Sequence, residues 1–193
     1  IQGGSRYCDH GTYSSGDPPA LNPRQLSSAI SQAGSTQSLI QLHAAHGTSF
    51  DHIHAANMWN KLGKQRDVSE HRYAVDLRRL LQHTTRLVGA SGAREWANIV
   101  HGVAKSRLHS QVRAEVCQLL EAVAEAAVRG GLAGFNPQDL ANTVWAYATA
   151  GVAADALYAA VAEVAVRGGL AGFTPQNLAN TVWAYATQGH YHQ

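Results

Sequence analysis

The sequence has few cysteines, few aromatic residues and no long apolar run, and each shortage argues against a class of protein. The two cysteines, Cys8 and Cys117, lack the spacing of a metal or redox motif, and so low a cysteine content favours a reducing compartment. No stretch approaches about 18 uncharged apolar residues, the length that predicts a helix across a bilayer. We therefore expect no membrane partner.

The sequence also lacks the short motifs of common enzymes. It contains no GxSxG, no Walker loop and no HExxH, so we expect no enzyme and no small-molecule substrate. The 11 histidines offer one pair with useful helical spacing, His43 and His46, and no set of cysteines or carboxylates accompanies it. We expect neither a metal ion nor another cofactor.

The amino-acid composition favours helices, and the net charge differs between the two halves of the chain. Hydrophobic residues make up 45% of the chain and aromatic residues 7%, with Ala, Leu and Val dominant, a mixture typical of helices that pack through small side chains. Residues 1–113 hold 13 Lys/Arg and 7 Asp/Glu, whereas residues 114–193 hold 2 and 6. The basic half suits contact with a polyanion, although ordinary surface charge explains it equally well.

One segment occurs twice in nearly identical form, 38 residues apart. Residues 134–151 read GFNPQDLANTVWAYATAG and residues 172–189 read GFTPQNLANTVWAYATQG. A period of 20 to 50 residues with a helical pattern predicts a solenoid, in which each repeat is a helical hairpin that buries its apolar face against its neighbours. We therefore predict an all-α fold, an α-solenoid of antiparallel hairpin repeats of about 38–44 residues.

Fainter copies lie upstream and share an Ala-Asn pair with the two strong ones. The four pairs are Ala56-Asn57, Ala97-Asn98, Ala141-Asn142 and Ala179-Asn180, at spacings of 41, 44 and 38 residues. Residues 27–193 are therefore interpreted as an array of about four repeats, expected to be a fragment of a longer chain. Residues 1–26, rich in Gly, Ser, Pro and Asp, are interpreted as an irregular N-terminal arm.

The repeated helices have clear start and stop signals. Asn136 and Thr174 each precede a proline, as an N-cap residue before Pro at the first helical position does, and Gly151 and Gly189 end the helices. The second helix of the pair is predicted at 154–167 and its upstream match at 111–129. Two earlier helices are predicted at 69–88 and 37–46.

The repeated helix is apolar on most sides and keeps one polar stripe. With the Asn as position 0, the small residues at −1 and +6 are expected to let helices approach closely, and the stripe falls at −3, 0, +4 and +7. Its members, repeat by repeat, are His54, Asn57, Lys61, Lys64; Glu95, Asn98, Gly102, Lys105; Asp139, Asn142, Ala146, Thr149; and Asn177, Asn180, Ala184, Thr187.

These positions allow more than one interpretation. Position −3 changes in every repeat, as a base-reading position should, but it also suits a solvated helix start. The constant Asn either ties one hairpin to the next or clamps a nucleic-acid backbone. Trp145 and Trp183, at +3, are more often core aromatics, with base stacking as the alternative. Asp139 is expected to face solvent and to differ from Asn177 in base preference.

The repeated segments resemble octotricopeptide repeats, over residues 27–189, strongly in the last two copies and weakly in the first two. This resemblance implies an α-solenoid that binds RNA in a mitochondrion or chloroplast, within a ribonucleoprotein assembly. The expected function is to hold or stabilise organellar RNA, as an rRNA-binding component of an organellar ribosome. The alternatives are a trans-acting factor for the stability, splicing or translation of one mRNA, and a protein-interaction scaffold without RNA contact.

If the chain binds RNA as the resemblance implies, the candidate RNA-contacting residues are the polar members of the stripe. Phosphate contact is expected mainly from Lys61, Lys64 and Lys105, with Arg78 and Arg79 as further candidates.

Overall fold

The computed structural model describes residues 21–189, which form nine α-helices and no strand. The helices are α1 (Pro23–Gln32), α2 (Thr36–His46), α3 (His52–Leu62), α4 (Ala74–Leu87), α5 (Ala93–Ser106), α6 (Arg113–Arg129), α7 (Pro137–Ala150), α8 (Asp155–Arg167) and α9 (Pro175–Gln188). Short 3-10 turns lie at Gly47–Ser49, His71–Tyr73, Val88–Ala90 and Ser110–Val112. The all-α prediction is confirmed.

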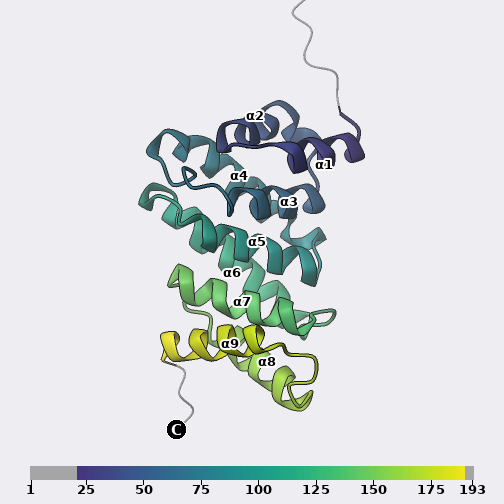
Figure 1. The fold of residues 1–193 in the computed structure, drawn as a ribbon, viewed down its shortest axis with the longest axis vertical. Helices are drawn as coiled ribbons and strands as arrows, with labels where there is room; N and C mark the ends of the chain where they lie inside the picture. Colours follow the sequence, from purple (N-terminus) through teal and green to yellow (C-terminus); the bar gives the residue numbers. More distant parts are fainter. Residues whose placement is uncertain (1–20, 190–193) are drawn as a thin grey trace, which may run out of the picture.

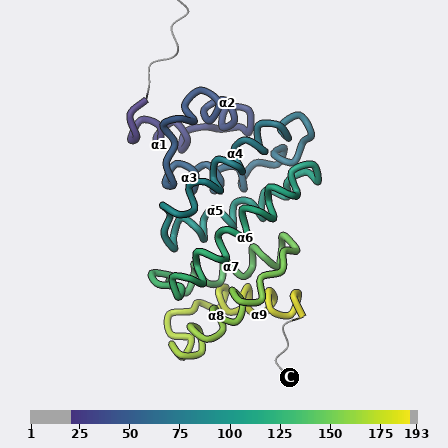
Figure 2. The backbone as a smooth tube through the Cα atoms, turned by 180° about the vertical axis from the view of Figure 1, so that it is seen from behind, coloured from purple at the N-terminus to yellow at the C-terminus, as the bar shows by residue number. Residues whose placement is uncertain are grey.

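The helices form two layers that run the length of the array. Helices α1, α3, α5, α7 and α9 pack in that order in one layer, and α2, α4, α6 and α8 pack in the other. We call these the front and rear layers, because Figure 1 views the first and Figure 2 the second. Helices α1, α3, α5 and α7 each form an antiparallel hairpin with the rear helix that follows, so the solenoid prediction is confirmed as well.

Side-chain caps begin the front helices where the sequence predicts. The amide of Asp139 donates to Asn136 Oδ1 at 2.9 Å in α7, and the amide of Asn177 donates to Thr174 Oγ1 at 3.2 Å in α9. Gly151 and Gly189 end these helices in the left-handed conformation.

The array begins earlier than the sequence interpretation placed it. Helix α1 starts at Pro23, inside the expected arm, and its N-cap Asn22 repeats the Asn136-Pro137 start of α7. Leu26, like Leu140, is buried, so α1 is one more copy of the front helix. The copy was missed because Ser27-Ser28 stands where the others have Ala-Asn. Residues 1–20 of the expected arm lie outside the described residues.

The core lies between the two layers and includes a set of buried hydroxyls. Tyr147 of α7 is fully buried, and its hydroxyl donates to the Leu120 carbonyl of α6 at 2.6 Å. Tyr185 occupies the same place in α9 and donates to the Tyr158 carbonyl of α8 at 2.6 Å. A buried hydroxyl needs such a partner, and here the partner joins each front helix to the rear helix before it.

Small residues let neighbouring front helices touch. The Ala residues at −1 in α3, α5 and α7 are buried, and so are Gly63, Ala104 and Ala148 at +6, as predicted. Helix α9 has the same residues but exposes Val182 by 68%, where Val144 is fully buried, because no described helix covers that side of α9.

Candidate nucleic-acid interface

The front layer presents one solvent-facing surface along the whole array. Counted from the constant Asn, it is formed by positions −4, 0, +3 and +7 of each front helix, and we call it the front face. Its members, all exposed or half-buried, are Arg24, Ser28, Ser31; Ile53, Asn57, Asn60, Lys64; Arg94, Asn98, His101, Lys105; Gln138, Asn142, Trp145, Thr149; and Gln176, Asn180, Trp183, Thr187.

The predicted stripe is therefore rotated on the helix surface. At about 100° per residue, positions −3 and +4 lie near +60° and +40°, whereas −4 and +3 lie near −40° and −60°. The first two positions point into the seam between front helices, and Gly102, Ala146 and Ala184 at +4 are all buried there. Positions 0 and +7 remain on the front face, as predicted.

Position −3 has a structural role instead of the predicted base-reading one. His54, Asp139 and Asn177 are only 1%, 8% and 8% exposed, so the expectation that Asp139 faces solvent is wrong. Position −3 is the third helical residue, and in α3, α5 and α7 its side chain turns back to accept the N-cap amide. The amide of Asn136 donates to Asp139 Oδ2 at 3.3 Å, and the amide of Asp51 donates to His54 Nδ1 at 3.2 Å.

Glu95 has the same capping role in α5, where it accepts the Gly92 amide at 3.1 Å. His, Glu and Asp can each accept this hydrogen bond, so capping accounts for the variation among these three residues at position −3. Burial raises the pKa of Asp139, although the Asn136 amide and the nearby Arg94 partly oppose this rise.

Three of the expected phosphate-binding cations are engaged elsewhere. Lys61 Nζ donates to the Ser31 carbonyl of α1 at 2.6 Å. Arg78 and Arg79 lie on α4 in the rear layer, so they do not join the front face. Arg78 Nε pairs with Glu115 of α6 at 2.8 Å, and Arg79 Nη1 pairs with Asp76 at 3.4 Å.

The constant Asn does not tie the hairpins together. The side chains of Asn57, Asn98 and Asn142 make no hydrogen bond within residues 21–189. Asn180 Oδ1 accepts a hydrogen bond only from Gln176 of its own helix, at 2.8 Å. A tie between hairpins is therefore absent from this part of the chain, and the amides are available to a ligand.

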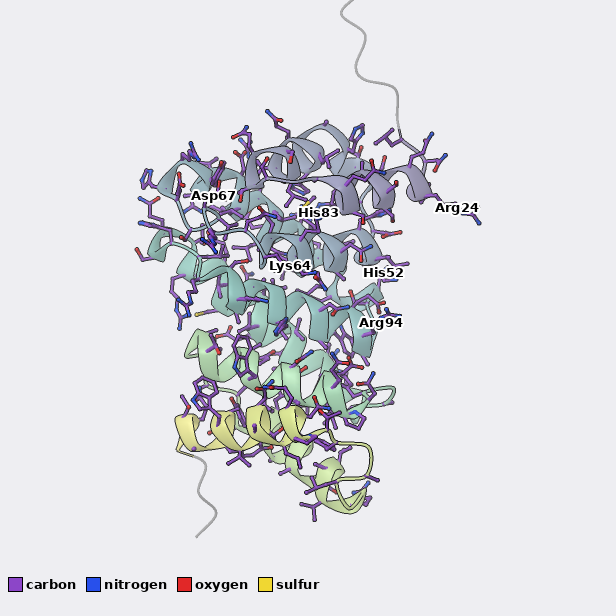
Figure 3. The ribbon with its side chains drawn as sticks, in the orientation of Figure 1. Arg24, His52, Lys64, Asp67, His83 and Arg94 are labelled. Carbon is purple, nitrogen blue, oxygen red and sulfur yellow. The ribbon has the colours of Figure 1, made fainter. Side chains whose placement is uncertain are left out.

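Carboxylates are distributed unevenly between the two layers, whereas Lys and Arg residues occur in both. The front face has four cations, Arg24, Lys64, Arg94 and Lys105, three of which Figure 3 labels, and it has no carboxylate in the described residues. The carboxylates that do occur within the front helices are the capping residues Glu95 and Asp139. Those of the rear helices are Asp76, Glu115, Glu121, Glu125, Asp155 and Glu163. The acidic C-terminal half therefore has most of its negative charge away from the front face.

A hollow of about 730 Å³ lies where α3 and α5 end. Four cations line it, Lys64, Arg66, Lys105 and Arg107, together with Trp145 of α7, and no carboxylate does. Sequence reasoning missed Arg66 and Arg107 because they follow the helix ends. Their signal was a shared Lys-x-Arg, KQR at 64–66 and KSR at 105–107, which the other repeats lack. Like charges held this close together favour a polyanion between them.

Three rings lie side by side at position +3 of successive front helices. The ring centroids of His101 and Trp145 are 5.1 Å apart, and those of Trp145 and Trp183 are 6.5 Å apart. Burial, and to a smaller extent Lys105, lower the pKa of His101, which favours the uncharged form of this ring. The front face thus changes from cations at α3 and α5 to aromatic rings at α7 and α9.

A comparison with protein families finds one family whose model covers most of this array. The family model of the Tbc2 translation factor, N-terminal domain, matches residues 74–193. The chain belongs to this family. The matched segment begins at the first residue of α4 and includes α5, α7 and α9, which form most of the front face. No curated protein matches the chain.

Membership of the Tbc2 family makes the chain a helical repeat protein with a role in translation or RNA handling. In the described part of the chain no helix combines the length and apolar character needed to cross a bilayer.

Proposed function

We propose that this chain is an octotricopeptide repeat protein that binds single-stranded RNA on its front face and serves translation in an organelle, without catalysing a reaction. One observation carries the proposal: the exposed positions of the front layer have four cations and no carboxylate. Phosphate neutralisation supplies much of the affinity of a protein for nucleic acid, and a single carboxylate in the path of the strand would oppose it.

The rest of the front face supports RNA over other polyanions. The amides of Asn57, Asn98 and Asn142 both donate and accept hydrogen bonds, as recognition of base edges requires. Helical repeats with two or three such side chains per repeat are a known way to contact RNA one base at a time. The family description, a translation factor, agrees with an RNA ligand.

The organelle and the octotricopeptide assignment rest on the sequence resemblance described above. Two forms of the function fit it: a component that holds rRNA in an organellar ribosome, and a factor that acts on one mRNA. The family description favours a part in translation in either form. Sequence preference separates the two forms, because a factor for one mRNA must discriminate between RNAs of equal length.

Binding to a labelled single-stranded RNA, measured over a range of salt concentrations, tests the proposal. Replacing Lys64 and Lys105 with Ala should weaken binding to every RNA sequence and reduce the slope of log affinity against log salt by roughly 1.5 units. Both lysines are exposed, so the fold should persist.

The matched control removes two exposed cations from the rear layer, Arg79 and Arg129, by replacement with Ala. This double variant should keep the slope of the unmodified chain. If it loses as much of the slope as the Lys64/Lys105 variant does, the front face is not the binding surface. If no RNA binds at low salt, the proposed function fails, and the protein-interaction scaffold becomes the favoured alternative.

A further inference from the structure

We propose that Trp145, with His101 and Trp183 on either side, stacks on unpaired bases of the bound strand, while the hollow beside it holds the phosphates of the same nucleotides. This inference rests on the proposed function, since it assigns chemistry to part of the front face.

The four tryptophans of the chain fall into two kinds. Trp59 is fully buried and donates to Thr84 Oγ1 at 2.9 Å, and Trp96 donates to the Val88 carbonyl at 3.0 Å. Both have the partner that a packed indole requires. The indoles of Trp145 and Trp183 donate to nothing within residues 21–189, and Trp183 is 46% exposed. Trp145 is half-buried and packs partly against the core, and Trp183 lies on the last described helix, where Val182 is exposed as well. The lack of an indole partner in both residues, rather than exposure alone, favours base stacking over an ordinary core role.

The neighbourhood of Trp145 supplies both parts of a nucleotide site. Trp145 lines the hollow together with Lys64, Arg66, Lys105 and Arg107. A phosphodiester in this hollow would be near four cations, and the base attached to it would be within reach of the indole. Aromatic platforms beside a basic groove are the usual means of holding single strands.

The three rings form a continuous strip, with centroid distances of 5.1 and 6.5 Å between neighbours. The front faces of α7 and α9 have no Lys or Arg, so stacking is the main contact that these two helices themselves offer to the strand. A base inside a duplex is already stacked and paired, so this strip selects unpaired bases.

The test compares three probes of equal length: oligouridylate, an abasic oligonucleotide that keeps the phosphates, and an RNA duplex. The unmodified chain should bind oligouridylate more tightly than either of the others, by about ten- to a hundredfold over the abasic probe. Trp145→Leu and Trp183→Ala should each reduce that preference, whereas Trp145→Phe, which keeps an aromatic ring, should retain most of it. Trp96→Phe, away from the strip, should leave it unchanged.

Two results would overturn the inference while leaving the proposed function intact. One is equal binding of oligouridylate and the abasic probe by the unmodified chain, with the salt slope still dependent on Lys64 and Lys105. The other is an unchanged preference in folded Trp145→Leu and Trp183→Ala variants. Failure of all three probes to bind would instead remove the proposed function, so the two failures are distinguishable.

Discussion

At the scale of single residues, His43 of α2 links stability to pH. Burial and the adjacent His83, whose Nδ1 lies 3.1 Å from His43 Nε2, lower the pKa of His43 to about 4, with Arg86 adding to this effect and Asp76 opposing it. The unfolded chain binds the proton near its ordinary pKa of about 6.5, so stability is lost as pH falls from about 6.5 towards 4. Because His43 is partly exposed, solvent screening reduces this effect, and the free energy of unfolding should be roughly 1 kcal/mol lower at pH 5 than at pH 7 through this residue.

Urea unfolding at the two pH values measures this difference, which His43→Gln should diminish. Ala44→Gln, at an exposed position on the same helix, should leave the difference as it is in the unmodified chain. An equal pH dependence in all three proteins would show that His43 does not exclude the proton.

Single residues also show which structural roles could be predicted from the sequence and which could not. The N-caps Asn136 and Thr174 were predicted because capping depends on neighbours in the chain. The role of position −3 was predicted wrongly because the same polar residue types occur at capping positions and at exposed positions. Only the burial of the side chain distinguishes the two. Arg66 and Arg107 were missed because they lie beyond the helix ends, and a helical repeat pattern gives no information about residues outside the helices.

At the scale of elements, the approach of α5 to α3 depends on Gly102. A Cβ added there would lie 2.4 Å from the Trp59 carbonyl oxygen, so Ala at this position must push the two helices apart. Gly102→Ala should lower the free energy of unfolding by about 1–3 kcal/mol, the cost of overpacking a tight contact. Thermal or urea unfolding monitored by circular dichroism measures it.

Gly89→Ala is the matched control, because no atom outside its chain neighbours and its own helical turn lies within 4 Å of the Cβ that would be added there. It should change stability by less than about 0.5 kcal/mol. Similar stabilities for Gly102→Ala and the unmodified chain would mean that the α3–α5 seam is looser than described.

The helices themselves were predictable to within a few residues, and their rotation was not. Periodicity locates the apolar sides of a helix, but small residues such as Gly102 and Ala146 count as neutral in such a pattern. Their burial at the seam turns the exposed stripe by roughly 50° from the predicted one. Helix α1 was missed for a related reason, since Ser27-Ser28 replaces the pair that marked the other copies.

At the scale of the whole molecule, the two layers separate two kinds of surface. The rear helices have most of the carboxylates, whereas the front face has cations over α1, α3 and α5 and aromatic rings over α5, α7 and α9. The sequence shows the charge difference between its halves, but the separation by layer exists only once the hairpins stack. This separation is what makes the front face a candidate for a negatively charged strand with unpaired bases.

Ultraviolet crosslinking of the full chain to single-stranded RNA, followed by mass spectrometry of the crosslinked peptides, tests the central claim most directly. The account predicts crosslinks on α3, α5, α7 and α9, concentrated near Lys64, Lys105, Trp145 and Trp183, and few on α4, α6 and α8. Crosslinks concentrated on the rear helices, or spread evenly over both layers, would contradict the claim that RNA binds the front face.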